Sequence, residues 1–392
     1  MSNGGAPDVR RGAIGPGGWR QRSERLDRVT RLARTIFGVD WTTITVLEED
    51  KAWFPSAQGI DPASTVLARR DTFCDTTGRL GETLIVRDAL ADPRFDRLPI
   101  VVDQGIRFYA GVPLHDAAGQ VLATLCLLDT APRDLDAEQR ETLEDLAAWA
   151  EQELQSSAEL VRAAEVQTSM LPSGPLAVEG WDVHGMCLPS LAVGGDLFDY
   201  AVSQDVLHVG LGDVMGKGTG AALLGAGVRT ALRRTHDAVV AGVDLGITVT
   251  QVARGLTPDL QRAASFVTLF EAAVDLDDGF MRYVDGGMGL CLVVRADGRL
   301  DRLSSDDLPL GVLADSHWTE QDTTLEPGDR LLLFSDGLLD LVDDQVEWWT
   351  PVGRLVREHD DAGSLLSTIA RMTATGSPTD DVTVVAVFRR AA

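Results

Sequence analysis

The spacing of apolar residues predicts one helix and several strands in the first third of the chain. In SERLDRVTRLARTIFG the apolar residues from Leu26 to Ile36 recur with a helical period, and Gly38 ends the segment. WTTITVLEED instead alternates apolar and polar positions, as a half-buried strand does. Further strands are predicted at ETLIVRDA, RFYAGVPLHD and QVLATLCLLD. We therefore expect an antiparallel sheet with flanking helices.

A segment without glycine or proline, residues 136–170, follows this region. It is rich in helix formers and is followed by Pro172, so it predicts a single long helix. Two interpretations stay open: a helix packed on one domain, and a signalling helix that pairs two copies of the chain. A loose heptad seam of mostly small residues supports the second interpretation: Leu143, Ala147, Ala150, Leu154, Ser157, Val161 and Ala164.

The second half contains a predicted hairpin that brings two aspartates together. In GGDLFDYAVSQDVLHVGLGDV, residues 194–214, two apolar runs flank a two-residue tip at 204–205. A register with this tip places Asp196 opposite Asp213. Directly opposed like charges are destabilising, so we expect a bound cation between the two carboxylates.

Three further aspartates lie at predicted strand ends. Asp336 interrupts the apolar run DRLLLFSDGLLDL, and Asp380 and Asp381 precede the alternating strand of PTDDVTVVAVF. A single Asp-Gly is usually a turn, but several acidic strand ends in one domain favour a common site. Because the motifs contain no histidine or cysteine, the site suits a hard cation, magnesium or manganese, and not zinc. The carbonyl of Val214 is a further candidate oxygen ligand.

Length and charge narrow the classes of function. A chain of 392 residues predicts two domains, and 44% hydrophobic with 24% charged residues is typical of globular proteins. The net charge of -25 argues against nucleic acid or anionic membrane as the main partner. No apolar run is long enough to span a membrane, and MSNGGAPDVRRGAIGPGG lacks the apolar region of a secretory signal. We expect a disordered N-terminal tail and a cytoplasmic location.

The loop GLGDVMGKGTG, residues 210–220, resembles a phosphate-binding loop only in part. Leu211 stands where that motif needs its first glycine, and Gly218 stands where it needs a hydroxyl. We therefore reject a nucleotide loop. Two interpretations of Lys217 stay open: it binds the phosphate of a substrate, or it is a solvent-exposed lysine of the loop.

The four cysteines, Cys74, Cys126, Cys187 and Cys291, are widely spaced, with no C-x-x-C pair. This pattern predicts neither a structural zinc site nor a disulfide framework. It favours cysteines that are buried in the core as small hydrophobic residues. For Cys74 and Cys126 a redox or chromophore role is the alternative.

The first half resembles a GAF domain over nearly its whole length. The resemblance rests on TFCD at 72–75, LIVRDALADPRF at 84–95, IRFYAGVPL at 106–114 and LATLCLLDTAPRDL at 122–135. It implies a sensory module whose ligand is a cyclic nucleotide, a haem, a tetrapyrrole or none.

The second half resembles the stage II sporulation protein E and RsbU branch of the metal-dependent protein phosphatases, from about Ala164 to Phe388. The ordered motifs are EVQTSMLP, GGDLFDY, GDVMGKGTGAALL, ASFVTLFEAAVDL, PLGV, LEPGDRLLLFSDGLLDL and TDDVTVVAV. The resemblance implies two packed antiparallel sheets covered by helices. It also implies two Mn²⁺ or Mg²⁺ ions that activate a water against a phosphoserine or phosphothreonine of a partner protein. That partner would be an anti-sigma-factor antagonist.

The resemblance also implies the roles of individual residues. Asp196 and Asp213 would ligate the metal pair, with the Val214 carbonyl as a further ligand. Asp336 and Asp380 would complete the set, and Asp381 would replace or assist Asp380.

Two positions depart from the family pattern. Met288 stands where many relatives have a histidine, and Asp340 stands where a glutamate is usual. Because that histidine is not a metal ligand in the family pattern, we expect activity to survive. A pseudophosphatase that docks a partner without catalysis is the alternative.

The sequence thus predicts an α+β protein of four segments. These are a disordered tail at 1–19, a GAF domain at 20–153, a helical linker at 154–172 and an α-β-β-α sandwich phosphatase at 173–392. The heptad seam further suggests a homodimer formed through the linker helix.

Overall fold

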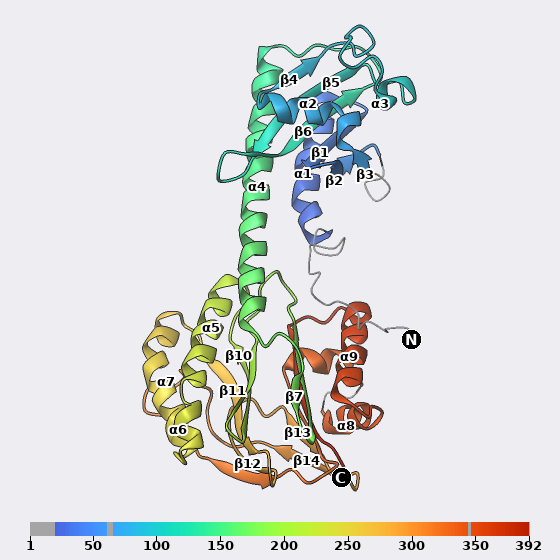
Figure 1. Ribbon diagram of the computed structural model, residues 1–392. Coiled ribbons are helices and arrows are strands. Elements are labelled where there is room, and N and C mark those ends of the chain that lie inside the picture. Colours follow the sequence, from blue (N-terminus) through green and yellow to red (C-terminus); the bar gives the residue numbers. More distant parts are fainter. Residues whose placement is uncertain (1–19, 61–65, 344–345, 392) are drawn as a thin grey trace. The chain divides into compact units, whose positions relative to one another are not determined.

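The structure is a computed structural model that describes residues 20–60, 66–343 and 346–391. The tail predicted at 1–19 lies outside the described residues. Contacts between residues divide the chain into two compact units, Met1–Glu159 and Leu160–Ala392. The boundary falls within the long helix α4, Ala137–Met170 (Figure 1).

The first unit is built on one antiparallel sheet of six strands with the order β3-β2-β1-β6-β5-β4. The strands are β1 (Trp41–Leu47), β2 (Lys51–Gln58), β3 (Val66–Ala68), β4 (Leu84–Val86), β5 (Phe108–His115) and β6 (Val121–Asp129). β2 and β3 extend the sheet on one side and were not among the predicted strands. The predicted antiparallel sheet with flanking helices is confirmed.

Helices cover both faces of this sheet. α1 (Arg20–Phe37) and the first half of α4 pack on one face, and α1 ends at Gly38, which has a left-handed φ of 59°. α2 (Phe73–Leu80) and α3 (Pro99–Val102) lie against the other face, where the core includes Phe73 and Tyr109.

The predicted long helix is present as α4, and its heptad seam has two parts. Leu143, Ala147, Ala150 and Leu154 are buried in the core of the first unit. For this half of the seam, packing on a single domain is the observed arrangement.

The second unit is a sandwich of two antiparallel sheets. One sheet has the order β15-β12-β11-β10-β9, with β9 (Leu197–Ser203), β10 (Val206–Val214), β11 (Val267–Asp275), β12 (Phe280–Gly286) and β15 (Gln321–Thr324). The other has the order β14-β13-β16-β17-β8-β7, with β7 (Leu176–Val178), β8 (Trp181–Leu188), β13 (Cys291–Val294), β14 (Leu300–Leu303), β16 (Arg330–Phe334) and β17 (Val382–Arg389). A core that includes Phe198, Phe270 and Leu333 fills the space between them.

Helices cover the outer face of each sheet, so the predicted α-β-β-α sandwich is confirmed (Figure 1). α5 (Thr219–Arg233), α6 (His236–Val240) and α7 (Leu245–Arg262) lie on the first sheet. α8 (Trp349–Arg357) and α9 (Ala362–Gly376) lie on the second, together with the 3₁₀ helix η3 (Asp336–Leu341).

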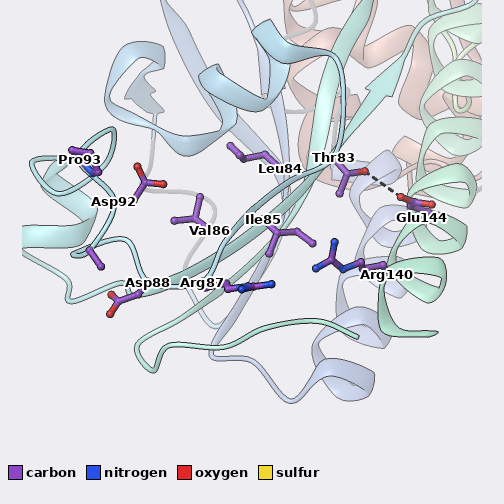
Figure 2. Close-up of a pocket in the computed structure, with 11 residues that line it drawn as sticks. Thr83, Leu84, Ile85, Val86, Arg87, Asp88, Asp92, Pro93, Arg140 and Glu144 are labelled. Atoms are coloured by element: carbon purple, nitrogen blue, oxygen red, sulfur yellow. Dashed lines mark hydrogen bonds between the residues drawn. The ribbon is translucent and has the colours of Figure 1, made fainter. Parts of the chain in front are cut away.

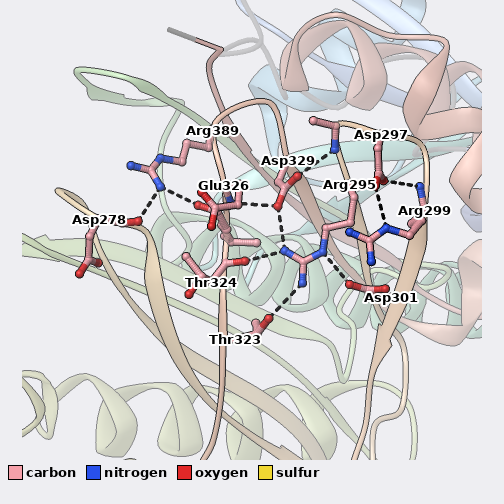
Figure 3. Close-up of polar contacts among 12 residues, drawn as sticks. Asp278, Arg295, Asp297, Arg299, Asp301, Thr323, Thr324, Glu326, Asp329 and Arg389 are labelled. Atoms are coloured by element: carbon pink, nitrogen blue, oxygen red, sulfur yellow. Dashed lines mark hydrogen bonds and ion pairs between the residues drawn. The ribbon is translucent and has the colours of Figure 1, made fainter.

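A partly buried arginine connects the two sheets at one edge (Figure 3). Arg295, just after β13, donates to the Asp329 carboxylate at 2.8 Å and to the Thr323 hydroxyl of β15 at 3.0 Å. Asp329 also accepts backbone N–H groups from Ala296 and Glu326. Because the Asp329 carboxylate is buried and its oxygens accept from several donors, we assign the pair a structural role.

Candidate metal centre

The strand pairing of β9 and β10 brings Asp196 next to Asp213. The two-residue turn at 204–205 is confirmed: Ser203 pairs with Val206, and the same register runs to Leu197 and Gly212. Gln204 takes a left-handed φ of 55° at the tip. Asp196 and Asp213 are the next positions beyond the pair Leu197–Gly212, so they lie at the open end of this ladder.

The two glycines before Asp196 are needed for close backbone contacts. A Cβ at Gly195 would lie 2.7 Å from the Val214 carbonyl oxygen, and a Cβ at Gly194 would collide with the Asp381 carboxylate. The Val214 N–H also donates weakly to the Gly195 carbonyl, at 3.4 Å. The segment that carries Asp196 therefore rests directly on the end of β10.

Hydrogen bonds between β16 and β17 set Asp336 beside residues 380–381. The Ser335 N–H donates to the Thr383 carbonyl, and the Thr383 N–H donates to the Ser335 hydroxyl, both at 2.9 Å. Gly337 follows Asp336, and a Cβ there would collide with the Asp381 carbonyl. The segment Ser335–Gly337 therefore packs closely against the residues at the start of β17.

Asp381 joins β17 to the segment before β9. Its buried carboxylate accepts the Ser190 N–H at 2.7 Å and the Gly195 N–H at 2.9 Å. Both oxygens therefore already have backbone partners. In this arrangement Asp381 shapes the segment that carries Asp196.

The carboxylates of the site raise one another's pKa. Burial, and then the charges of Asp336 and Asp380, raise the pKa of Asp213 to about 6. Burial, followed by the charge of Asp213, raises the pKa of Asp196 well above its usual range. Burial and then the charge of Asp380 raise the pKa of Asp336. Each carboxylate therefore lies within electrostatic reach of the next, although they come from four separate segments.

Lys217 contacts the candidate ligand Asp380. Its ammonium lies 2.9 Å from Oδ2 of Asp380 and donates to the Thr379 carbonyl at 2.8 Å. Asp340 holds the same loop by accepting the N–H and the hydroxyl of Thr379 at 2.8 and 2.6 Å. The loop before β17 is thus held by the Lys217 ammonium, which comes from another loop, and by the Asp340 carboxylate of η3.

The residues present suit hard divalent cations. Oδ2 of Asp196 is buried and has no hydrogen-bond partner, which is costly unless another group satisfies it. The donors are all carboxylate or carbonyl oxygens, which magnesium and manganese prefer. In the described parts of the chain, however, no three acidic, histidine or cysteine side chains already form a group that could hold a metal ion. Lys217 and the backbone amides occupy part of the coordinating capacity of Asp380 and Asp381.

Met288 is accommodated without a polar partner. Its half-buried side chain packs against the core between the two sheets. The Asp285 carboxylate accepts the backbone N–H groups of Met288, at 2.8 Å, and of Gly289, and so fixes the conformation of this loop.

Sequence reasoning missed a buried polar cluster under α6. The rings of His208 and His236 stack with centroids 3.8 Å apart, and neither ring nitrogen of His208 has a hydrogen-bond partner. Glu271 on β11 is also buried, with a pKa that burial raises well above its usual range. Because His208 lies in an apolar strand and His236 is distant in sequence, no local pattern could have indicated the pair.

The first unit has an open hollow of about 850 Å³ beside its edge strand β4 (Figure 2). Its lining mixes charges of both signs, including Arg87, Asp88, Arg140 and Glu144. This lining does not select one class among the ligands expected for a GAF domain.

Comparison with protein families agrees with the two units. Residues 21–154 match the GAF domain, and residues 203–390 match Stage II sporulation protein E (SpoIIE). The chain therefore joins a GAF domain to a SpoIIE-type domain. Among the described residues, no helix combines the length and the apolar character needed to cross a membrane.

Two curated relatives match about half of the chain. Protein IcfG of Synechocystis is 25% identical over 206 residues, which are 46% of this chain and 32% of that protein. The phosphoserine phosphatase RsbU of Bacillus subtilis is 27% identical over 192 residues, 48% of this chain and 55% of that protein. The matches thus span a third to about half of these relatives.

Solved structures that this chain resembles include the RsbU and RsbW domains of Rv1364c from Mycobacterium tuberculosis. That structure has 27% identity and a TM-score of 0.47, and the match covers 56% of this chain and 62% of that one. The SiaA phosphatase 2C domain of Pseudomonas aeruginosa has 20% identity and a TM-score of 0.49, covering 61% of this chain and 99% of that one.

Proposed function

We propose that this chain is a metal-dependent protein serine/threonine phosphatase regulated by its GAF domain. The observation that carries the proposal is the electrostatic contact among Asp196, Asp213, Asp336 and Asp380, which come from four segments of the unit that contains the SpoIIE match. Burying several carboxylates near one another costs free energy through desolvation and repulsion. Such an arrangement is expected at a functional site, where the carboxylates bind an ion or take part in catalysis.

The residues of the chain have separate tasks in this proposal. Asp196, Asp213, Asp336, Asp380 and the Val214 carbonyl hold two Mn²⁺ or Mg²⁺ ions. When bound, these ions acidify a water nucleophile and neutralise charge on the phosphoryl group. Asp381 is kept as an assisting ligand, but its contacts with Ser190 and Gly195 favour a positioning role.

Lys217 lies at the edge of the same site and has two possible tasks. Its exposed ammonium can turn toward a substrate phosphate once its contact with Asp380 is released. If Lys217 instead keeps its contact with Asp380, its task is to neutralise the charge of that carboxylate in the loop before β17.

The partner and its control are part of the proposal. We infer a phosphorylated anti-sigma-factor antagonist as substrate, from the SpoIIE-type domain and the RsbU relative. We also infer that a small molecule or another signal at the GAF domain acts through α4, in a cytoplasmic protein. A homodimer through α4 would have to use positions beyond Leu154, because the earlier seam is buried in the first unit.

Hydrolysis of a generic phosphate monoester by the full chain tests the class. We expect activity with Mn²⁺ that disappears with chelator and falls at least about 100-fold in Asp213→Ala, the range for a group that organises a catalytic site. Glu179→Ala, an exposed carboxylate in a turn, is the matched control and should keep wild-type activity. Activity that persists in chelator and in Asp213→Ala would refute the proposal.

A docking scaffold without catalysis remains the second candidate. The ion pair between Lys217 and Asp380 favours it, since an ammonium there competes with a metal ion for the carboxylate. The same assay separates the two candidates, because a scaffold would show no hydrolysis at any Mn²⁺ concentration.

A further inference from the structure

Two cysteine thiols lie in contact inside the first unit. Cys74 is in the first turn of α2 and Cys126 is in the middle of β6, with their sulfurs 3.3 Å apart. Both are free thiols, with 6% and 0% of their surface exposed. They are 52 positions apart in the sequence, so only the packing of α2 on the sheet brings them together.

The pair is surrounded by hydroxyl groups within an apolar core. Cys126 lies 3.1 Å from the Thr124 hydroxyl and 3.5 Å from the Tyr109 phenol. The Tyr109 phenol is in turn 2.7 Å from the Thr77 hydroxyl. A Cβ at Gly111 would collide with the Tyr109 ring, so this glycine gives the phenol room to lie near the sulfur. Buried hydroxyl groups of this kind can stabilise charge on sulfur.

The two thiols are not equivalent. A hydrogen bond from the Cys126 thiol lowers the pKa of Cys74 to about 7, against the effect of burial. Burial, and then the contact with Cys74, raise the pKa of Cys126 well above its usual range. Cys74 is also the more exposed of the two. It therefore has the character of the attacking sulfur, and Cys126 that of the resolving sulfur.

We propose that Cys74 and Cys126 form a peroxide-sensitive dithiol that closes reversibly into a disulfide. The Cys74 thiolate attacks one peroxide oxygen and the O–O bond breaks, so that Cys74 becomes a sulfenic acid. The other oxygen takes up the proton that the Cys74 thiol released and leaves as water or alcohol. The Cys126 sulfur then attacks the Cys74 sulfur, and the S–O bond breaks to release water with the Cys126 proton. Two electrons pass from the thiols to the peroxide, and a thiol reductant reverses the reaction.

Closure of this bond would move secondary structure. A disulfide needs its sulfurs about 2.05 Å apart, so the present 3.3 Å separation must shorten by more than 1 Å. The shift would draw the start of α2 toward β6. That this change alters hydrolysis rests on the proposed function, whereas formation of the disulfide does not.

The test uses the full chain, first reduced and then treated with hydrogen peroxide near equimolar concentration. We expect the intact mass to fall by two hydrogens. Non-reducing peptide mapping should show a peptide pair that joins Cys74 to Cys126, which dithiothreitol separates. Cys187, whose pKa burial raises to about 12, and Cys291 should still be alkylated after unfolding.

Matched variants separate the pair from the other thiols. Cys74→Ser should abolish the two-hydrogen loss, while Cys187→Ser should retain it. If Cys74→Ser folds poorly, non-reducing peptide mapping of the wild-type protein still shows whether Cys74 and Cys126 are joined. Peroxide treatment that leaves both thiols open to alkylation, or that adds oxygen to Cys74 without a link to Cys126, would overturn the proposal. Failure of hydrolysis in a protein that still forms this disulfide would count against the proposed function only.

Discussion

At the scale of single residues, neighbouring aspartates have different tasks. Asp380 is half-exposed and paired with Lys217, whereas Asp381 is buried and accepts two backbone N–H groups. The sequence predicts that this Asp-Asp pair belongs to the site. Which of the two aspartates faces the other carboxylates depends on the loop that Asp381 supports, which comes from a distant part of the chain.

Asn substitutions should distinguish the two aspartates. In chelator, Asp381→Asn should lower the free energy of unfolding by about 3 kcal/mol, because two backbone N–H groups lose the charge of this buried acceptor. Asp380→Asn should lower it by less than about 1 kcal/mol, because its ion pair is exposed. Urea unfolding of both variants measures this difference. Equal losses would contradict the assignment.

The buried histidine pair should make stability depend on pH. Burial, and then the charges of His236 and Arg282, lower the pKa of His208 to about 3. A base with a lowered pKa contributes stability above its unfolded pKa of about 6.5 and loses it as the pH falls toward the folded value. At pH 5 the loss attributable to His208 is about 2 kcal/mol.

His208→Phe isolates this contribution, because Phe keeps an aromatic ring against His236 but does not titrate. Glu271, buried nearby, works in the opposite direction, since its raised pKa favours the folded state as pH falls. We therefore expect the wild type to lose about 2 kcal/mol relative to the variant between pH 7.5 and pH 5. Parallel pH profiles from urea unfolding would refute this prediction.

At the scale of elements, α5 packs directly on the segment that carries Asp196. Gly225 packs against the site, since a Cβ there would lie 3.3 Å from the Gly195 carbonyl oxygen. Gly227 is two residues further along the same helix and has open space around its Cβ direction. The sequence places several glycines in this segment, but it does not show which of them contacts the segment that carries Asp196.

Alanine substitutions at these two positions form a matched pair. Gly227→Ala should raise the free energy of unfolding by up to about 1 kcal/mol and leave hydrolysis unchanged, because alanine favours a helix. Gly225→Ala has the same helical advantage but pushes α5 away from the segment that carries Asp196. We expect it to weaken Mn²⁺ binding several-fold, as measured by calorimetry. Equal Mn²⁺ affinities would show that α5 does not control the site.

At the scale of the whole molecule, α4 is the covalent link between the two units. If its helical structure carries a signal, a break near Ser157 should uncouple the units. Proline within a helix costs about 3 kcal/mol, so Ser157→Pro should break α4 locally. Peroxide should then change the hydrolysis rate in the wild type and in Ser157→Ala, but not in Ser157→Pro. A retained response in Ser157→Pro would refute coupling through the helix.

The sequence by itself determined the elements with strong local patterns and the family motifs. It predicted α4, the register of the β9–β10 hairpin, the sandwich class and a set of acidic strand ends, because periodicity and turn residues act locally. It missed β2 and β3. Only the tertiary structure decided which side chains meet: Asp381 with Gly195, His208 with His236, and Cys74 with Cys126. These contacts join residues far apart in the chain, and local sequence patterns carry no information about such distances.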